Sequence, residues 1–106
     1  MKTTRYALLL SLALATAAQA DDTAAEVYTA KCKSCHGPDG KAQTKVGEKE
    51  KIADISAAEW QKGHSDADIR KVIAEGSTKN TKMKAYKDKL TPEQIDALVG
   101  YVRTFK

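Results

Sequence analysis

The pentapeptide Cys32-Lys33-Ser34-Cys35-His36 decides the fold, because it combines two thiols and an imidazole at a fixed spacing. C-x-x-C-H is the attachment signature of haem c. At the end of a helix, two thiols at this spacing can reach two vinyl groups on one edge of a porphyrin. The imidazole that follows can then place a nitrogen on the iron from one face. We therefore predict that Cys32, Cys35 and His36 bind one covalent haem, with His36 as an iron ligand.

Three other interpretations of this motif remain open. A disulfide between Cys32 and Cys35 fits an exported protein. A thioredoxin-like redox pair would need a βαβ context, which the sequence lacks. A structural zinc ion takes about four ligands, and the chain offers two cysteines and two histidines, the second being His64. Export to an oxidising compartment, where haem is attached covalently, favours the haem.

Upstream of the motif, residues 1–20 have the layout of a secretory signal peptide. The segment begins with two basic residues, residues 6–20 carry no charge, and the small residues Ala18 and Ala20 form a cleavage site. The uncharged run is shorter than the ~20 apolar residues of a membrane-spanning helix. We therefore expect cleavage after Ala20 and a periplasmic location.

Cleavage would leave residues 21–106 as one domain of 86 residues, with no other hydrophobic run long enough to cross a membrane. It removes only two charges, those of Lys2 and Arg5. Lys+Arg then falls from 18 to 16 against 14 Asp+Glu, and the formal net charge falls from +4 to +2. This small excess, with no basic run, gives no support to a nucleic-acid partner.

The secondary-structure signal of the mature domain is helical throughout. Four segments each begin with a capping box, in which Ser or Thr stands three residues before an acid or an amide. No segment alternates with period two, so an all-α fold of about four short helices is expected, with loops over residues 37–55 and 77–90. The helices are expected to begin at Thr23, Ser56, Ser65 and Thr91.

Two of these helices carry clear apolar stripes. Ile69, Val72 and Ile73 mark the third helix, and the last helix carries Ile95, Leu98, Val99 and Val102. The core is otherwise poor in bulky side chains, with one Phe and one Trp. A domain of this size is marginal on apolar burial alone, so a large apolar cofactor would complete it.

Both ends of the mature domain resemble class I c-type cytochromes. Residues 24–42, AAEVYTAKCKSCHGPDGKA, resemble the start of that family, where a helix leads into C-x-x-C-H-G. Residues 83–103, MKAYKDKLTPEQIDALVGYVR, resemble its end, where a Met ligand loop precedes a final helix. The resemblance implies a cytochrome c-like fold around one haem, with Ala24 and Tyr101 where the first and last helices cross. Lys84 stands where a Pro often follows the ligand Met in that family.

The resemblance also implies that Met83 is the second iron ligand. Met83 is the only methionine left after cleavage, and it stands alone in a cationic loop before a capped helix. The alternative role for a methionine is to fill a gap in the core. His64 is the other candidate ligand, but its place between two helix signals indicates an exposed connector. Trp60 is expected in ordinary core packing rather than at the haem.

His/Met ligation predicts an electron carrier. A thioether stabilises ferrous iron and raises the potential, and a six-coordinate iron has no open site for a substrate. We therefore predict one-electron transfer and no catalytic residue. The alternative is a haem c sensor or weak peroxidase with a labile Met83 bond, and a third interpretation is a haem-free zinc or disulfide module.

Lysines surround both ligand segments. Lys31 and Lys33 flank Cys32, and five more surround Met83, namely Lys79, Lys82, Lys84, Lys87 and Lys89. Such a basic ring would steer acidic redox partners toward the haem, whereas the plain alternative is a solvated surface. The sequence thus predicts a soluble monomer with protein redox partners.

Overall fold

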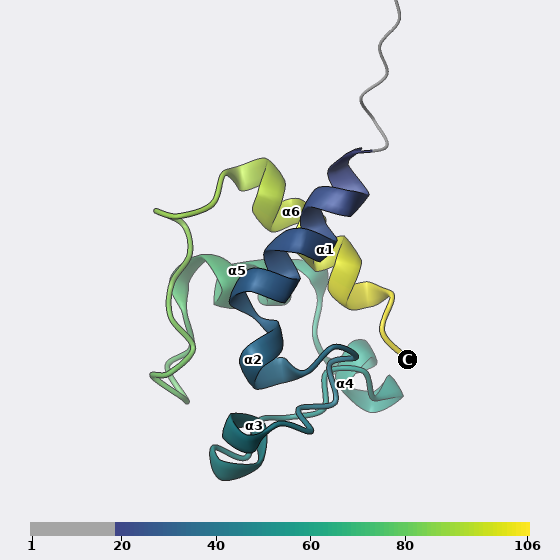
Figure 1. The fold of residues 1–106 in the computed structure, drawn as a ribbon, viewed down its shortest axis with the longest axis vertical. Helices are drawn as coiled ribbons and strands as arrows, with labels where there is room; N and C mark the ends of the chain where they lie inside the picture. The colour runs from purple at the N-terminus through teal and green to yellow at the C-terminus, as the bar shows by residue number, and fades with distance from the viewer. Residues whose placement is uncertain (1–18) are drawn as a thin grey trace, which may run out of the picture.

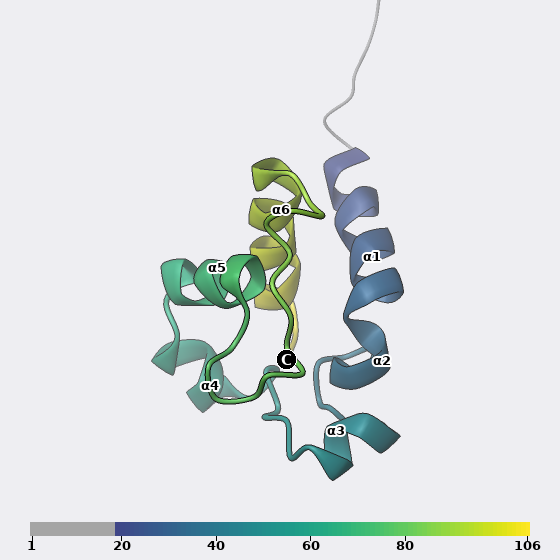
Figure 2. The same ribbon diagram turned by 90° about the vertical axis from the view of Figure 1, so that its left-hand side faces the viewer.

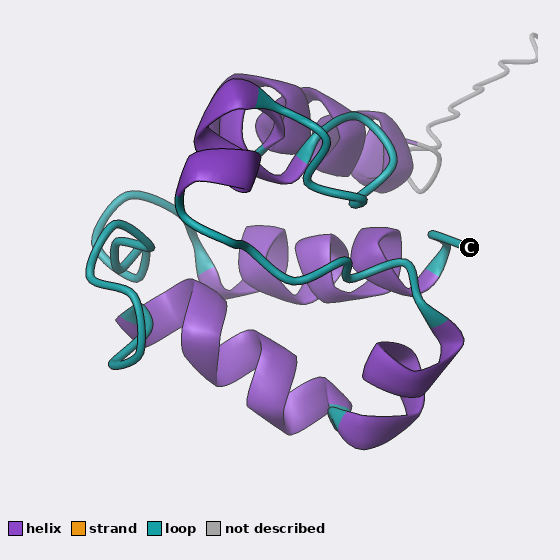
Figure 3. Cartoon of the chain, turned by 90° about the horizontal axis from the view of Figure 1, so that it is seen from below, coloured by secondary structure: helices purple, strands orange, loops and turns teal. Residues whose placement is uncertain are grey.

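The computed structural model describes residues 19–106, with side chains from residue 24 onward. No strand occurs among these residues (Figure 3), which confirms the predicted all-α class. Apart from its last two residues, the predicted signal peptide lies outside the described residues. The helices are α1 (Gln19–Lys31), α2 (Lys33–His36), α3 (Lys45–Lys49), α4 (Ala58–Gly63), α5 (Asp66–Glu75) and α6 (Pro92–Arg103).

The C-terminal helix α6 organises the fold, because it packs against both α1 and α5. Figure 2 shows α6 between these two helices, and Figure 1 shows α1 crossing it. At the crossing, the rings of Tyr28 and Tyr101 lie 5.2 Å apart between centroids. Ala24 is buried on the same helix as Tyr28. The expected contact between the first and last helices is therefore present.

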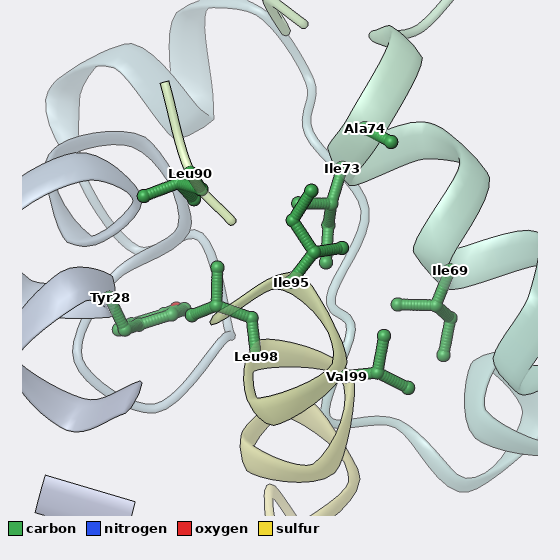
Figure 4. Packing of buried hydrophobic residues seen from close by; sticks show 8 residues of the cluster. All are labelled: Tyr28, Ile69, Ile73, Ala74, Leu90, Ile95, Leu98 and Val99. Atoms are coloured by element: carbon green, nitrogen blue, oxygen red, sulfur yellow. The ribbon is translucent and has the colours of Figure 1, made fainter. Parts of the chain in front are cut away.

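The buried face of α6 supplies the middle of the core. Figure 4 shows Leu98 directed toward Tyr28 of α1, while Ile95 lies toward Ile73 of α5. All four members of the predicted α6 stripe are buried, and each such side chain stabilises the fold by about 1.5–3 kcal/mol relative to exposure. The core cluster consists of Tyr28, Ile69, Ile73, Ala74, Leu90, Ile95, Leu98 and Val99.

The capping boxes predicted for α5 and α6 are present in full. Ser65 Oγ accepts from the Asp68 N–H at 3.1 Å, and the Asp68 carboxylate accepts from the Ser65 N–H at 3.2 Å. Thr91 and Gln94 make the same two bonds at 3.1 and 2.8 Å, with Pro92 in the first turn. These bonds satisfy N–H groups that the helix itself leaves without partners.

The predictions for the starts of α1 and α4 were wrong. α4 begins after Ala57, because the buried Ser56 hydroxyl instead donates to Asp54 Oδ1 at 2.5 Å and accepts from Lys41 Nζ at 2.9 Å. α1 begins at Gln19, four residues before the predicted cap Thr23. No Gly or Pro lies between these two positions, so nothing in the sequence stops the helix there.

Two further details of the helices differ from the expectation. Val72 is 40% exposed, and Ala74 is buried in its place on α5. The reason is that the chain returning from residue 86 onward covers the Ala74 side of the helix, where the Lys87 N–H donates to the Ala74 carbonyl at 3.0 Å. Within the predicted loop 37–55, the short helix α3 forms, capped by Thr44, whose hydroxyl accepts from the Gly47 N–H at 2.8 Å.

Residues 77–90, called here the Met83 loop, contain no helix or strand, as predicted. They connect α5 to α6, and Figure 2 shows them in front of the other elements. The described residues include no helix that is both long enough and apolar enough to cross a bilayer.

Candidate functional site

The C-x-x-C-H motif lies where α1 passes into α2. The Cys32 N–H donates to the Tyr28 carbonyl at 2.8 Å, which continues α1, and the His36 N–H donates to the Cys32 carbonyl at 2.9 Å, which forms the next helical turn. Residues three and four apart on a helical turn share a face. The backbone therefore places both thiols and the imidazole on the same side of the turn, which is the arrangement that haem attachment requires.

The carbonyl groups at the end of this turn are held by three hydrogen bonds. Thr44 Oγ1 donates to the Cys35 carbonyl at 2.8 Å, and the Ala42 N–H donates to the His36 carbonyl at 2.8 Å. The Tyr28 hydroxyl donates to the Gly37 carbonyl at 2.6 Å. The position of His36 is thus fixed by α1 on one side and by the segment before α3 on the other.

Both cysteines are half-buried free thiols in the structure. Burial raises the pKa of Cys32 to about 11, with a smaller contribution from the charge of Cys35 and an opposing one from Lys31.

The His36 ring lies mostly inside the protein. Its Nδ1 atom is buried without a hydrogen-bond partner, and burial lowers the pKa of the imidazole. A neutral imidazole is the form that ligates a metal. Two thiols and a neutral imidazole on one turn are a donor set that fits haem c. Among residues 19–106, no three His, Cys, Asp or Glu side chains lie close enough to share a metal ion.

Met83 lies in a tight turn of the Met83 loop. Its N–H donates to the Asn80 carbonyl at 3.0 Å, and its carbonyl accepts from the Ser77 N–H at 3.1 Å. The side chain is half-buried and packs against the core cluster, as do Cys32 and Tyr86. The structure thus brings two segments against one apolar cluster: the Met83 loop and the turn at residues 32–36, called here the haem-attachment turn.

Tyr86 is a residue of this site that sequence reasoning missed. Its hydroxyl donates to the Lys31 carbonyl at 3.3 Å, across from the loop to the end of α1. Burial raises the pKa of Tyr86, and the charges of Cys32 and Cys35 raise it further. An aromatic residue three positions after Met83, in an otherwise polar loop, was the only signal in the sequence.

The other candidate ligand, His64, contacts Trp60 and Arg103. Its ring stacks on Trp60 at 4.4 Å between centroids, and its Nδ1 lies 2.9 Å from the Trp60 carbonyl. Arg103 of α6 donates to the His64 carbonyl. His64 is a connector as predicted, but it is half-buried rather than exposed. Trp60 packs against the core cluster, as expected.

Gly76 determines the path of the chain into the Met83 loop. It has φ +84°, and a Cβ added there would lie 2.9 Å from the Met83 carbonyl oxygen and 3.2 Å from the Ala85 nitrogen. Neither backbone atom can move without moving the loop.

We expect Gly76→Ala to destabilise the fold by about 1–3 kcal/mol, because an L residue at positive φ is strained and the loop must shift. Thermal unfolding should show a lower melting temperature. Gly100→Ala is the matched control, since a Cβ at Gly100 meets nothing within 4 Å. Equal melting temperatures for the two variants would contradict this account of Gly76.

Comparison with known proteins places this arrangement in a family. Residues 19–102 match the family model described as cytochrome C oxidase, cbb3-type, subunit III. The chain is 34% identical over 80 residues to the cbb3-type cytochrome c oxidase subunit FixP of Azorhizobium caulinodans, covering 76% of this chain and 25% of that protein. It is 35% identical over 85 residues to the subunit CcoP of Rubrivivax gelatinosus, covering 77% of this chain and 26% of that protein. The chain thus spans about a quarter of the length of these relatives.

A solved structure of similar size also matches. The KustC0563 c-type cytochrome superposes with a TM-score of 0.71 at 42% identity, covering 78% of this chain and 96% of that one. A point mutant of the same cytochrome gives a TM-score of 0.70 at 40% identity, covering 79% and 99%. The fold is therefore cytochrome c-like. The chain belongs to the c-type cytochrome family described as cbb3-type cytochrome c oxidase subunit III, and its cofactor is a covalently bound haem c with iron.

Proposed function

We propose that this chain is a soluble periplasmic electron carrier with one haem, attached at Cys32 and Cys35 and ligated by His36 and Met83. The observation that carries the proposal is the helical turn at residues 32–36, which puts two thiols and an imidazole with a buried Nδ1 on one face. The Met83 loop, packed against the same apolar cluster as Cys32, supports Met83 as the second ligand.

Each side chain has a distinct task in this proposal. Haem, when bound, supplies an iron that gains and loses one electron. The two cysteines hold the group in place, so it stays with the protein through every exchange. Burial lowers the pKa of His36, which favours the neutral imidazole that can ligate iron. The soft sulfur of Met83 favours ferrous iron, raises the potential and leaves no coordination site open.

Two observations bear on where the carrier works. Residues 1–20 have the layout of a signal peptide, which supports export and release into the periplasm. Both curated relatives are subunits of cbb3-type cytochrome c oxidases, which supports electron transfer with protein redox partners. A carrier of this kind is not itself an enzyme.

A visible spectrum of the purified protein tests this function. The haem should resist extraction by acid-acetone, and the iron should be low-spin and insensitive to CO. Extractable haem would contradict attachment at Cys32 and Cys35. Rapid CO binding to the wild-type ferrous protein would favour the second candidate, a haem sensor or weak peroxidase with a labile Met83 bond.

The lysines of the ligand segments are all exposed, which supports a role in partner docking. Exposed charges act within a Debye length of ~8–10 Å. We expect simultaneous charge reversal of Lys82, Lys84 and Lys87 to lower the rate of electron transfer with an acidic partner by about tenfold at low salt. The salt dependence of that rate should also become flatter. Stopped-flow kinetics over a range of ionic strength measures both effects.

The control needs lysines away from the site. Glu50 lies 4.0 Å from Lys82, so α3 and its lysines border the Met83 loop and are unsuitable. Reversal of Lys62, Lys71 and Lys106, which are also exposed, changes the net charge equally. If both triple variants slow the reaction to the same extent, only net charge matters and local docking is wrong.

A further inference from the structure

The backbone hydrogen bonds that join the Met83 loop to another helix run to α5. The Ser77 N–H closes the turn by bonding to the Met83 carbonyl at 3.1 Å. The Tyr86 N–H donates to the carbonyls of Ile73 and Ala74 at 3.0 and 3.1 Å. The first of these bonds lies within the loop, and the other two fix its Tyr86 end to α5. None of them connects the loop to the side of the molecule that carries the cysteines.

Within the described residues, two polar side-chain contacts connect the Met83 loop to that other side. One joins Lys82 Nζ to Glu50 Oε2 at 4.0 Å, with the Lys82 side chain 64% exposed. An exposed ion pair of this length contributes little. The other is the exposed 3.3 Å hydrogen bond from the Tyr86 hydroxyl to the Lys31 carbonyl, and here the Tyr86 ring also packs against the core cluster.

The break between α1 and α2 leaves the Lys31 carbonyl free to accept from Tyr86. In a continuous helix, the Cys35 N–H would bond to the Lys31 carbonyl four residues before it. Here the Cys35 N–H donates to the Cys32 carbonyl instead, at 3.2 Å. Carbonyls at the end of a helix must find partners outside it. The Tyr86 hydroxyl supplies that partner for the residue directly before Cys32.

We propose that Tyr86 is a positioning residue that ties the Met83 loop to the haem-attachment turn and thereby keeps Met83 on the iron. This rests on the proposed ligation by Met83. Because the hydroxyl bonds to the residue before Cys32 and the backbone of the same residue is fixed to α5, Tyr86 holds the two ligand segments at a set separation. Loss of the hydroxyl releases the loop from the attachment side without removing the aromatic ring.

Tyr86→Phe tests the proposal in the haem-loaded protein. A hydrogen bond of this kind shifts an equilibrium by roughly threefold to tenfold. The fraction of ferrous protein with Met83 off the iron should rise by that factor. The apparent affinity for CO is proportional to this open fraction, so it should rise equally, and the reduction potential should fall. If Tyr86 only stabilised the fold, Tyr86→Phe would change the melting temperature but neither the CO affinity nor the reduction potential.

A double-mutant cycle tests whether Tyr86 affects CO affinity through Met83. In a Met83→Ala background no Met83 bond remains to be positioned, so adding Tyr86→Phe should leave CO affinity unchanged. Tyr101→Phe is the matched control, because it also removes a hydroxyl from a partly buried ring on the core cluster. Lys82→Gln removes the other contact across the site and should have little effect on CO affinity.

Each outcome of the cycle has a definite meaning. A rise in CO affinity with Tyr86→Phe that disappears in the Met83→Ala background supports the proposal. No rise, in a protein where Met83→Ala alone opens the iron, overturns the role of Tyr86 and leaves Met83 ligation intact. Equal rises in both backgrounds also overturn it, since Tyr86 would then act on access to the iron. If Met83→Ala itself leaves both CO binding and the reduction potential unchanged, the proposed ligation is wrong and this inference falls with it.

Discussion

Met83→Ala is expected to lower the reduction potential by on the order of 0.1–0.3 V, within the roughly 0.8 V range that axial ligands set. The thioether that favours ferrous iron is lost, and residues 19–106 contain no second methionine to replace it. His36 and both cysteines are unchanged, so the protein should stay red and folded. The open position should bind CO or cyanide, and weak peroxidase activity is expected.

Redox titrations and ferrous CO spectra of wild type and Met83→Ala measure this effect. Val72→Ala serves as the control, because it truncates an exposed apolar side chain outside the site. A loop lysine such as Lys82 or Lys84 could replace the lost ligand and keep the iron low-spin, but the spectrum and the potential would still change. His64 is less available, since its ring stacks on Trp60. An unchanged potential with an unchanged CO response would show that Met83 is not a ligand, and His64→Ala would be the next variant.

Replacing both attachment cysteines, Cys32→Ala with Cys35→Ala, should leave the chain largely unfolded. The apolar core of this domain is small. Leu98 is the only large side chain of the described residues with less than 2% exposure. A large apolar cofactor held on the chain adds buried apolar surface to the folded state that the small core otherwise lacks. A domain with a total stability of about 5–15 kcal/mol can lose most of it when such a contribution is removed.

Circular dichroism and thermal unfolding test this coupling. Ser34→Ala is the matched control, because it changes an exposed residue between the two cysteines and leaves attachment intact. We expect Ser34→Ala to melt like wild type. A cooperative transition of the double cysteine variant within a few degrees of wild type would mean that the protein folds independently of haem attachment.

Several features of the fold followed from local sequence. The capping boxes at Ser65 and Thr91 formed as predicted, because each bond joins residues only three apart and needs no help from the rest of the chain. The α6 stripe was likewise buried as its spacing indicates. The haem-attachment motif is also local, so a single turn of backbone brings Cys32, Cys35 and His36 to one face.

Other features depended on residues distant in sequence. Ser56 stands at a position that is typical of an N-cap. Its hydroxyl instead accepts a hydrogen bond from Lys41, fifteen residues earlier in the chain. Val72 fits an apolar stripe, but the loop after residue 86 covers Ala74 instead. In both cases a tertiary contact outweighed a local preference of comparable size.

The sequence by itself therefore determined the helical class, two capped helices and the shared face of Cys32, Cys35 and His36, since all of these depend on short-range spacing. Only the tertiary structure decided how the two ligand segments meet. The Tyr86 hydroxyl reaches a carbonyl fifty-five residues away, and Gly76 holds the Met83 turn through close backbone contacts. Such contacts leave no periodic signal in the chain, because they arise from the packing of α1, α5 and α6 around one core.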